Sequence, residues 1–245
     1  MLGIYEEESL EMCWRISTNR NQTEDEYWVI IWNLFQQNGL QVESIDAIII
    51  SSVVPPLRFP LVKMAERYFK ITPLIVGPGI KTGLNILYDN PREIGADRVV
   101  NAVAGIELYG GPLILVDFGT ATTFCAISAQ GDYLGGAIAP GIGISTEALF
   151  AKADKLPRVE IVNPKRIIGK DTITCIQIGI YYGFVGQVDG IVKRMLKDFP
   201  ESPKVIATGG LAGLIARESE TINEVNPFLT LAGLRIIYNK NIPVK

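Results

Sequence analysis

Residues 113–124 read Leu-Ile-Leu-Val-Asp-Phe-Gly-Thr-Ala-Thr-Thr-Phe, and this stretch decides how the chain is interpreted. Its four leading apolar residues predict a buried β-strand that ends at Asp117, and Gly119 allows the backbone to turn and approach a ligand. Hydroxyl groups donate hydrogen bonds to phosphate oxygens, and three follow the strand: Thr120, Thr122 and Thr123. The stretch therefore indicates nucleotide chemistry, with an ordinary turn solvated by threonines as the alternative.

Composition excludes several classes of protein. The chain has 245 residues, of which 48% are hydrophobic, so it can bury a core without disulfides or structural metals. Its three cysteines form no CxxC pair, which argues against a disulfide framework and a zinc site. Histidine is absent, so acid–base work falls to carboxylates, lysines or tyrosines. A net charge of -3 without a basic stripe argues against nucleic acid as a partner.

Nothing in the sequence directs the chain to a membrane, and we expect it in the cytoplasm. Residues 173–188 carry no charge, but a membrane span needs roughly 20 apolar residues. We expect this run to be a helix buried between domains. A dimer interface is the alternative to a lobe core, and the lobe core is the default. The N-terminus carries Glu6, Glu7 and Glu8 where a signal peptide needs positive charge.

Apolar periodicity on both sides of the opening stretch predicts alternating strands and helices. Strands are expected at 2–5, 12–16, 45–54, 73–76, 113–116, 122–128, 133–139 and 204–207. Helices are expected from a capping box at Thr23 and Glu26 to Asn38, and then at 57–69, 96–109, 144–151, 172–199 and 227–238. Gly110-Gly111-Pro112 marks the predicted boundary between two similar α/β lobes, 1–110 and 111–245, with a ligand cleft between them.

Two further segments are candidate binding elements. Residues 88–98 read Tyr-Asp-Asn-Pro-Arg-Glu-Ile-Gly-Ala-Asp-Arg, where Gly95 and Ala96 leave room for a ligand against the backbone. The alternative is a helix start with solvated charge pairs, each worth about 0.2–1 kcal/mol. Gly209 and Gly210 follow another predicted strand, where their amides can approach an adenosine or phosphate group, or serve only as a turn.

Several blocks together resemble the type III pantothenate kinases, and they occur in that family's order. The blocks are Asn90–Arg98, Val116–Thr123, Gly135–Gly141 and Ile168–Thr172, with weaker matches at Trp14–Thr18 and Ser51–Pro55. The resemblance covers nearly the whole chain. It implies an α/β fold of two ribonuclease-H-like, actin-like lobes with mixed sheets flanked by helices.

The resemblance also implies an activity: ATP-dependent phosphorylation of pantothenate to 4'-phosphopantothenate, the first step of coenzyme A synthesis, by a homodimer. Its implied cofactors are a monovalent cation, K⁺ or NH₄⁺, and Mg²⁺. Asp97 is then the catalytic base, Asp117 holds the monovalent cation, and Gly119, Thr120, Gly209 and Gly210 contact ATP. Pantothenate is bound by Tyr88, Gly95, Ala96, Asp97, Arg98 and Thr172. A related kinase for a sugar or acetate-like acceptor is the further alternative.

The resemblance departs from the family at the start of the sequence. Family members begin with a strand carrying Asp-x-Gly-Asn-Thr, whereas this sequence starts at a segment similar to the family's second strand. Without that strand we expect an unpaired neighbouring strand edge and weak or undetectable kinase activity for residues 1–245. A misassigned start or trimmed chain is one explanation, and a non-catalytic pantothenate-binding or regulatory homologue is the other.

Overall fold

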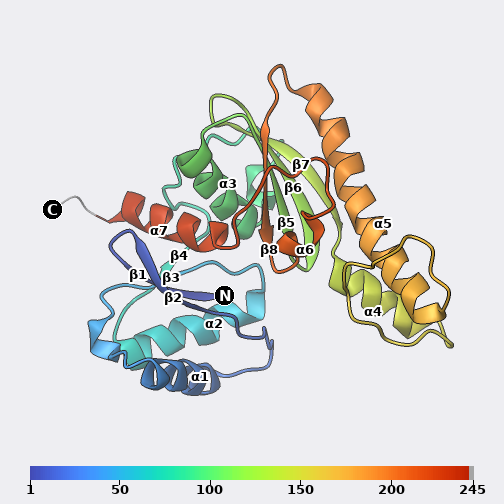
Figure 1. The fold of residues 1–245 in the computed structure, drawn as a ribbon. Coiled ribbons are helices and arrows are strands. Elements are labelled where there is room, and N and C mark those ends of the chain that lie inside the picture. Colours follow the sequence, from blue (N-terminus) through green and yellow to red (C-terminus); the bar gives the residue numbers. More distant parts are fainter. Residues whose placement is uncertain (243–245) are drawn as a thin grey trace. The chain divides into compact units, whose positions relative to one another are not determined.

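The computed structural model describes residues 1–242, which pack as two units (Figure 1). Unit 1 contains residues 1–83, 92–100 and those from Leu231 to the end of the described chain. Unit 2 contains residues 84–91 and 101–230. These units are defined by contacts within the chain and do not test the predicted domain boundaries. The two lobes, 1–110 and 111–245, therefore stay a prediction.

Unit 2 is built on one five-stranded mixed sheet. Its strands lie in the order β7 (Tyr133–Pro140), β6 (Ala121–Ile127), β5 (Leu113–Phe118), β8 (Lys204–Gly209) and β9 (Glu224–Val225). The central strand β5 pairs antiparallel with β6 and parallel with β8. The predicted α/β class with a mixed sheet is confirmed, while β9, which has two residues, was not predicted.

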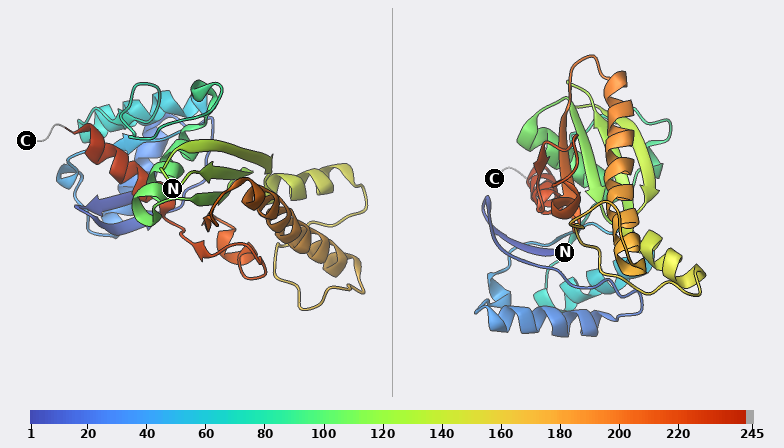
Figure 2. Two further views of the ribbon diagram at one scale, coloured as in Figure 1. Left: turned by 90° about the horizontal axis from the view of Figure 1, so that it is seen from above. Right: turned by 45° about the vertical axis from the view of Figure 1, so that its right-hand side comes forward.

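Helices cover both faces of this sheet, as Figures 1 and 2 show. Ile114, Val116 and Phe118 of β5 join a core with α5 (Thr172–Met195) and α6 (Ala212–Ile215), and a 3₁₀ turn (Leu196–Asp198) follows α5. The alternate residues Leu113 and Leu115 face Gly105 of α3 (Ala96–Tyr109), and α4 (Ile142–Lys152) follows β7. Because side chains alternate along a strand, Asp117 shares the α3 face.

The charge-free run 173–188 lies inside α5, and one face of it belongs to the core of unit 2. Tyr181 and Val188 are fully buried there, and Asp189 continues the buried face. Burial in a lobe core, the default expectation, is confirmed for this face. None of the helices in residues 1–242 is long and apolar enough to cross a membrane.

Unit 1 contains two separate two-stranded sheets within residues 1–242. β1 (Leu2–Glu6) and β2 (Ser9–Trp14) form an antiparallel pair, and β3 (Ile49–Ile50) and β4 (Leu74–Ile75) form a separate parallel pair. Its helical layer consists of α1 (Glu24–Gln37), α2 (Pro55–Met64), a π-helical turn (Ala65–Phe69) and α7 (Leu229–Asn241), the first two residues of which belong to unit 2. Short 3₁₀ turns lie at Val42–Ser44 and Pro91–Glu93.

In the described residues each of the four strands of unit 1 pairs along one edge only, β3 among them. The carbonyls of Ile48 and Ile50 accept hydrogen bonds from Leu74 and Val76 at 2.8 and 2.9 Å. Backbone groups alternate between the two edges of a strand, so the N–H and C=O of Ile49 point away from β4. These main-chain groups form an open edge.

Local chemistry explains where the helices of unit 1 begin. The predicted capping box is present, because the Thr23 amide donates to Glu26 Oε2 at 2.8 Å and the Glu26 amide donates to Thr23 Oγ1 at 3.4 Å. The strand predicted at 45–54 was too long, since only Ile49–Ile50 is paired. Helix α2 begins at Pro55 rather than Leu57, because proline suits the first helical position.

Asp189 of helix α5 accepts hydrogen bonds from the loop 219–221. We expect these hydrogen bonds to make the free energy of unfolding depend on pH in the acid range. Burial would raise the pKa of Asp189, but hydrogen bonds from Ser219, the Glu220 amide and Thr221 outweigh it and lower the pKa below 3.8. The stabilisation is therefore present above pH 3.8 and is lost as the pH falls through the folded-state pKa. Urea unfolding of Asp189→Asn should show a loss of about 1–3 kcal/mol at pH 7, shrinking below pH 3.8; a pH-independent loss would contradict this.

Candidate functional site

The two predicted glycine-bearing motifs of unit 2 lie side by side at the carboxyl ends of β5 and β8. These strands are parallel, with Asp117 opposite Thr208 and Phe118 opposite Gly209. Carboxyl ends of neighbouring parallel strands are where open α/β sheets bind ligands. The structure thus brings Asp117, from the opening stretch, next to Gly209, from the second candidate motif.

The close approach of β5 and β8 requires glycine at position 209. Its φ is +94°, and a Cβ atom there would lie 2.6 Å from the Phe118 carbonyl oxygen and 2.7 Å from Asp117 Oδ1. Side chains rarely adopt such a φ, and neither oxygen leaves room for a methyl group. Glycine therefore lets the half-buried Asp117 carboxylate lie against the backbone of β8.

The turn after Asp117 is open to solvent, and Gly141 contacts its backbone. Gly119 and Thr120 are exposed, and the Gly141 amide donates to the Thr120 carbonyl at 3.1 Å. A Cβ on Gly141 would lie 2.3 Å from that carbonyl oxygen. Gly210, directly after β8, is also exposed, whereas Gly209 is half-buried and the Gly119 amide donates to the Ala121 carbonyl at 3.1 Å.

Burial separates the three threonines of the opening stretch. Thr122 is 1% exposed and Thr123 is 9% exposed, whereas Thr120 lies on the surface. The Thr122 hydroxyl has no hydrogen-bond partner among the described residues. Of the three hydroxyls, only that of Thr120 is placed to reach a phosphate as the chain stands.

The residues expected to act on the acceptor begin helix α3 in unit 1. The Gly95 carbonyl accepts from the Arg98 and Val99 amides at 3.1 and 3.2 Å, which starts the helix. Half-buried Asp97 accepts a 2.8 Å hydrogen bond from the Arg98 amide through Oδ1, and a Cβ on Gly95 would lie 2.5 Å from that oxygen. The absence of a side chain at Gly95 thus gives the Asp97 carboxylate its room, while Arg98 is 5% exposed.

The two remaining predicted contacts with pantothenate lie in unit 2, on different elements. The Tyr88 ring packs edge-on to Tyr133 with 6.3 Å between ring centroids, and it also lies 3.8 Å from the position of a Cβ on Gly135. Exposed Thr172 begins α5 directly after the N-cap Asp171. Hydrogen bonds from the Thr174 amide and hydroxyl lower the pKa of Asp171, so this helix end keeps a charged cap.

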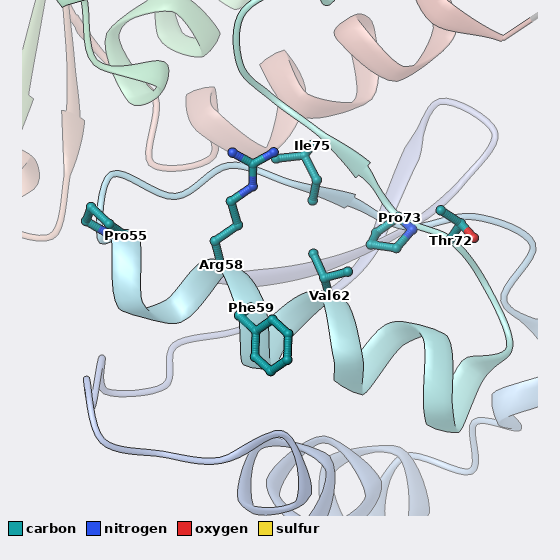
Figure 3. Close-up of a pocket in the computed structure, with 7 residues that line it drawn as sticks. All are labelled: Pro55, Arg58, Phe59, Val62, Thr72, Pro73 and Ile75. Atoms are coloured by element: carbon teal, nitrogen blue, oxygen red, sulfur yellow. The ribbon is translucent and has the colours of Figure 1, made fainter.

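A shallow cavity of about 480 Å³ lies in unit 1, between α2 and β4 (Figure 3). The Arg58 guanidinium extends over it toward Ile75, and the Phe59 ring at its rim is 66% exposed. None of the predicted site residues lines this cavity, so we assign it no part in the chemistry. Its lining consists of Pro55, Arg58, Phe59, Val62, Thr72, Pro73 and Ile75.

Sequence reasoning missed Asn101, which is 2% exposed and touches the predicted cation ligand. Its Nδ2 donates to Asp117 Oδ2 at 3.0 Å. The available signal was its position on the predicted helix 96–109, where a polar residue falls within an apolar sequence of alanines and valines. That signal alone does not distinguish a functional asparagine from a structural one.

The comparisons with known proteins name the same family as the sequence motifs did. The family model described as "Type III pantothenate kinase" matches residues 1–194. This chain belongs to the type III pantothenate kinase family. A protein of Geobacillus sp. (strain WCH70) named "Type III pantothenate kinase" is 63% identical over 245 residues, covering 100% of this chain and 95% of the relative.

A second relative supports the same membership in the type III pantothenate kinase family. The "Type III pantothenate kinase" of Halalkalibacterium halodurans is 60% identical over 242 residues, covering 99% of this chain and 95% of the relative. The crystal structure of a "conserved putative Baf family transcriptional activator" from Campylobacter jejuni is 20% identical, with a TM-score of 0.54 over 85% of this chain and 88% of that chain. That likeness shows a shared fold.

The oxygen atoms around Asp117 can be compared with what K⁺ and Mg²⁺, the cations implied by the type III pantothenate kinase family, need as ligands. Asp117 contributes a carboxylate, and the Gly119–Thr120 turn beside it contributes carbonyl and hydroxyl oxygens, which are hard donors suited to K⁺. No group of three or more acidic, cysteine or histidine side chains is placed to hold a metal ion within residues 1–242. Mg²⁺ is usually bound by one or two carboxylates together with substrate phosphates, which is compatible with this site.

Proposed function

We propose that this chain is a pantothenate kinase, which transfers a phosphoryl group from ATP to the primary hydroxyl of pantothenate and so opens coenzyme A synthesis. The observation that carries the function is the 60–63% identity to two relatives named type III pantothenate kinase over almost the whole chain. A non-catalytic homologue is not favoured, because both relatives are named as enzymes. A sugar or acetate-like acceptor is disfavoured on the same ground.

We assign the roles within the reaction from the residues' chemistry. Phosphoryl transfer depends on positioning and electrostatic stabilisation, with a carboxylate to accept the proton of the attacking hydroxyl. Asp97 has that role, since its Oδ1 is held by the Arg98 amide and the chain offers no histidine. The buried Arg98 side chain supplies positive charge next to it for the pantothenate carboxylate.

The remaining contacts divide by element. The exposed Gly119–Thr120 turn, including the Thr120 hydroxyl, binds the nucleotide together with Gly209 and Gly210, and Tyr88 and Thr172 contact pantothenate. Asp117 holds the monovalent cation, K⁺ or NH₄⁺, which supplies positive charge beside the phosphates, and Mg²⁺ accompanies ATP. Each of these assignments rests on the match of motif positions and on the exposure described above.

We also propose a cytoplasmic homodimer. Unit 2 presents large apolar side chains on neighbouring segments: β7, α4, the segment before α5, and the first residue pair of α5. A second copy of this chain would cover such a surface, as exposed apolar patches commonly mark interfaces. The exposed residues are Ile138, Ile144, Leu149, Ile167, Ile168 and Ile173. Sedimentation of Ile168→Glu should give a lower mass than the parent; an unchanged mass would remove this face from the dimer.

The function is tested by measuring ADP release with pantothenate, glucose or acetate as acceptor, in buffer containing K⁺ and Mg²⁺. We expect release, weak for residues 1–245, with pantothenate and none with glucose or acetate, and mass spectrometry of the product should find 4'-phosphopantothenate. Release that depends on glucose or acetate would replace the proposal by the related-kinase alternative. Tight pantothenate binding in calorimetry without any turnover would support the non-catalytic alternative.

A further inference from the structure

Asn101 connects Asp117 to helix α7 through a chain of two side-chain hydrogen bonds within unit 2. Its Nδ2 donates to Asp117 Oδ2 at 3.0 Å, and its Oδ1 accepts from Thr230 Oγ1 at 2.7 Å. An ionised carboxylate can only accept hydrogen bonds, so the amide nitrogen must face Asp117. The Thr230 hydroxyl then has to be the donor to the amide oxygen, and the direction of both bonds is fixed.

Burial makes this arrangement rigid. Asn101 is 2% exposed, and a buried amide cannot turn without leaving its donors and acceptor unpaired. On the other side of the carboxylate, Asp117 Oδ1 lies against the glycine backbone of β8, 2.7 Å from where a Cβ of Gly209 would be. The rotation of the Asp117 carboxyl group is therefore defined from both sides.

The choice of an amide has a chemical consequence. A lysine or arginine at position 101 would form an ion pair with Asp117 and offset the negative charge that attracts a cation. An amide donates one hydrogen bond and brings no net charge. Asn101 can thus orient the carboxylate without adding a positive charge of its own beside it.

We propose that Asn101, anchored by Thr230, is a positioning residue that orients Asp117 for binding of a monovalent cation. The inference rests on the proposed role of Asp117 in the kinase. It adds two residues, on α3 and α7, that act through Asp117 and touch neither ATP nor pantothenate.

The test compares Asn101→Leu, Thr230→Val and Thr230→Ser with the parent chain. The first readout is the rise in melting temperature with KCl at constant ionic strength, with choline chloride as the replacement salt. The second is the K⁺ concentration that gives half-maximal ADP release. Loss of a residue that orients a metal ligand typically weakens metal affinity about 10–100-fold. We therefore expect Asn101→Leu and Thr230→Val to raise the half-maximal K⁺ concentration in both readouts by about this factor. Thr230→Ser, which keeps the hydroxyl, should leave both concentrations at the parent values.

Thr221→Val is the matched control. The Thr221 hydroxyl is also buried in unit 2 and donates to a carboxylate, Asp189 Oδ1, at 2.7 Å. Its loss should lower the melting temperature without moving either K⁺ midpoint. If Asn101→Leu and Thr230→Val behave like this control, the positioning role is wrong and the two residues are structural. If Asn101→Leu does not fold, the Thr230→Val and Thr230→Ser pair decides the question.

The outcome also separates this inference from the proposed function. A parent chain that phosphorylates pantothenate but shows no K⁺ response in either readout overturns the inference and leaves the kinase assignment intact. A parent chain that phosphorylates glucose or acetate instead of pantothenate overturns the proposed function, and the KCl-dependent melting temperatures of the same variants still decide whether Asn101 supports a cation site.

Discussion

Replacing Asp97 by asparagine is expected to lower kcat for pantothenate phosphorylation by about 10²–10⁴, the usual contribution of a general base. The amide has nearly the same shape as the carboxylate, and its oxygen can still accept the 2.8 Å hydrogen bond from the Arg98 amide. It cannot take up the proton of the attacking hydroxyl. Pantothenate affinity, measured by calorimetry, should therefore stay close to that of the parent while ADP release falls.

Asp198→Asn is the control for this substitution. Asp198 is an exposed residue of the 3₁₀ turn after α5, so the same chemical change there should leave kcat unaltered. Full activity of Asp97→Asn would show that another group removes the proton. Loss of pantothenate binding together with activity would instead assign Asp97 to substrate binding.

The second large effect is expected for Gly209→Ala. The new methyl group would meet the Phe118 carbonyl at 2.6 Å and Asp117 Oδ1 at 2.7 Å, and alanine at φ +94° is strained in addition. Overpacking costs about 1–3 kcal/mol and left-handed backbone adds about 1–2 kcal/mol. We expect urea unfolding to show a total loss of about 2–5 kcal/mol and the KM for ATP to rise, because the Asp117 carboxyl group must move.

Gly213→Ala provides the contrast, since nothing lies within 4 Å of a Cβ at this position in α6. Alanine favours a helix over glycine by up to about 1 kcal/mol, so Gly213→Ala should be neutral or stabilising. Equal stability of Gly209→Ala and Gly213→Ala would contradict the close packing between β5 and β8.

Local sequence patterns were sufficient to predict most of the elements. The capping box at Thr23 and Glu26 marked the start of α1, and the apolar spacing of 96–109 gave α3 with the bounds that the structure has. The run 113–116 predicted β5 because it is continuous and apolar, as expected of a central strand covered on both faces. These signals depend on neighbouring residues alone.

What the sequence did not predict depends on contacts between distant segments. The hydrogen bonds of Asn101 form only when α3, β5 and α7 meet, and Thr230 lies 129 residues from Asn101 along the chain. The need for glycine at Gly141 comes from the Thr120 carbonyl on a neighbouring strand end. The strand predicted at 45–54 was overestimated because β-branched residues favour strands but need a paired neighbour.

The open edges of β1 and β3 also affect how the protein behaves at high concentration. Unpaired main-chain groups on a strand can recruit a strand from another molecule, and proteins usually prevent this with charges or proline within the edge strand. Ile49–Ile50 has neither, and in β1 the only charge is Glu6, at its last position. We therefore expect these strands of unit 1 to take part in edge-to-edge aggregation when the protein is concentrated.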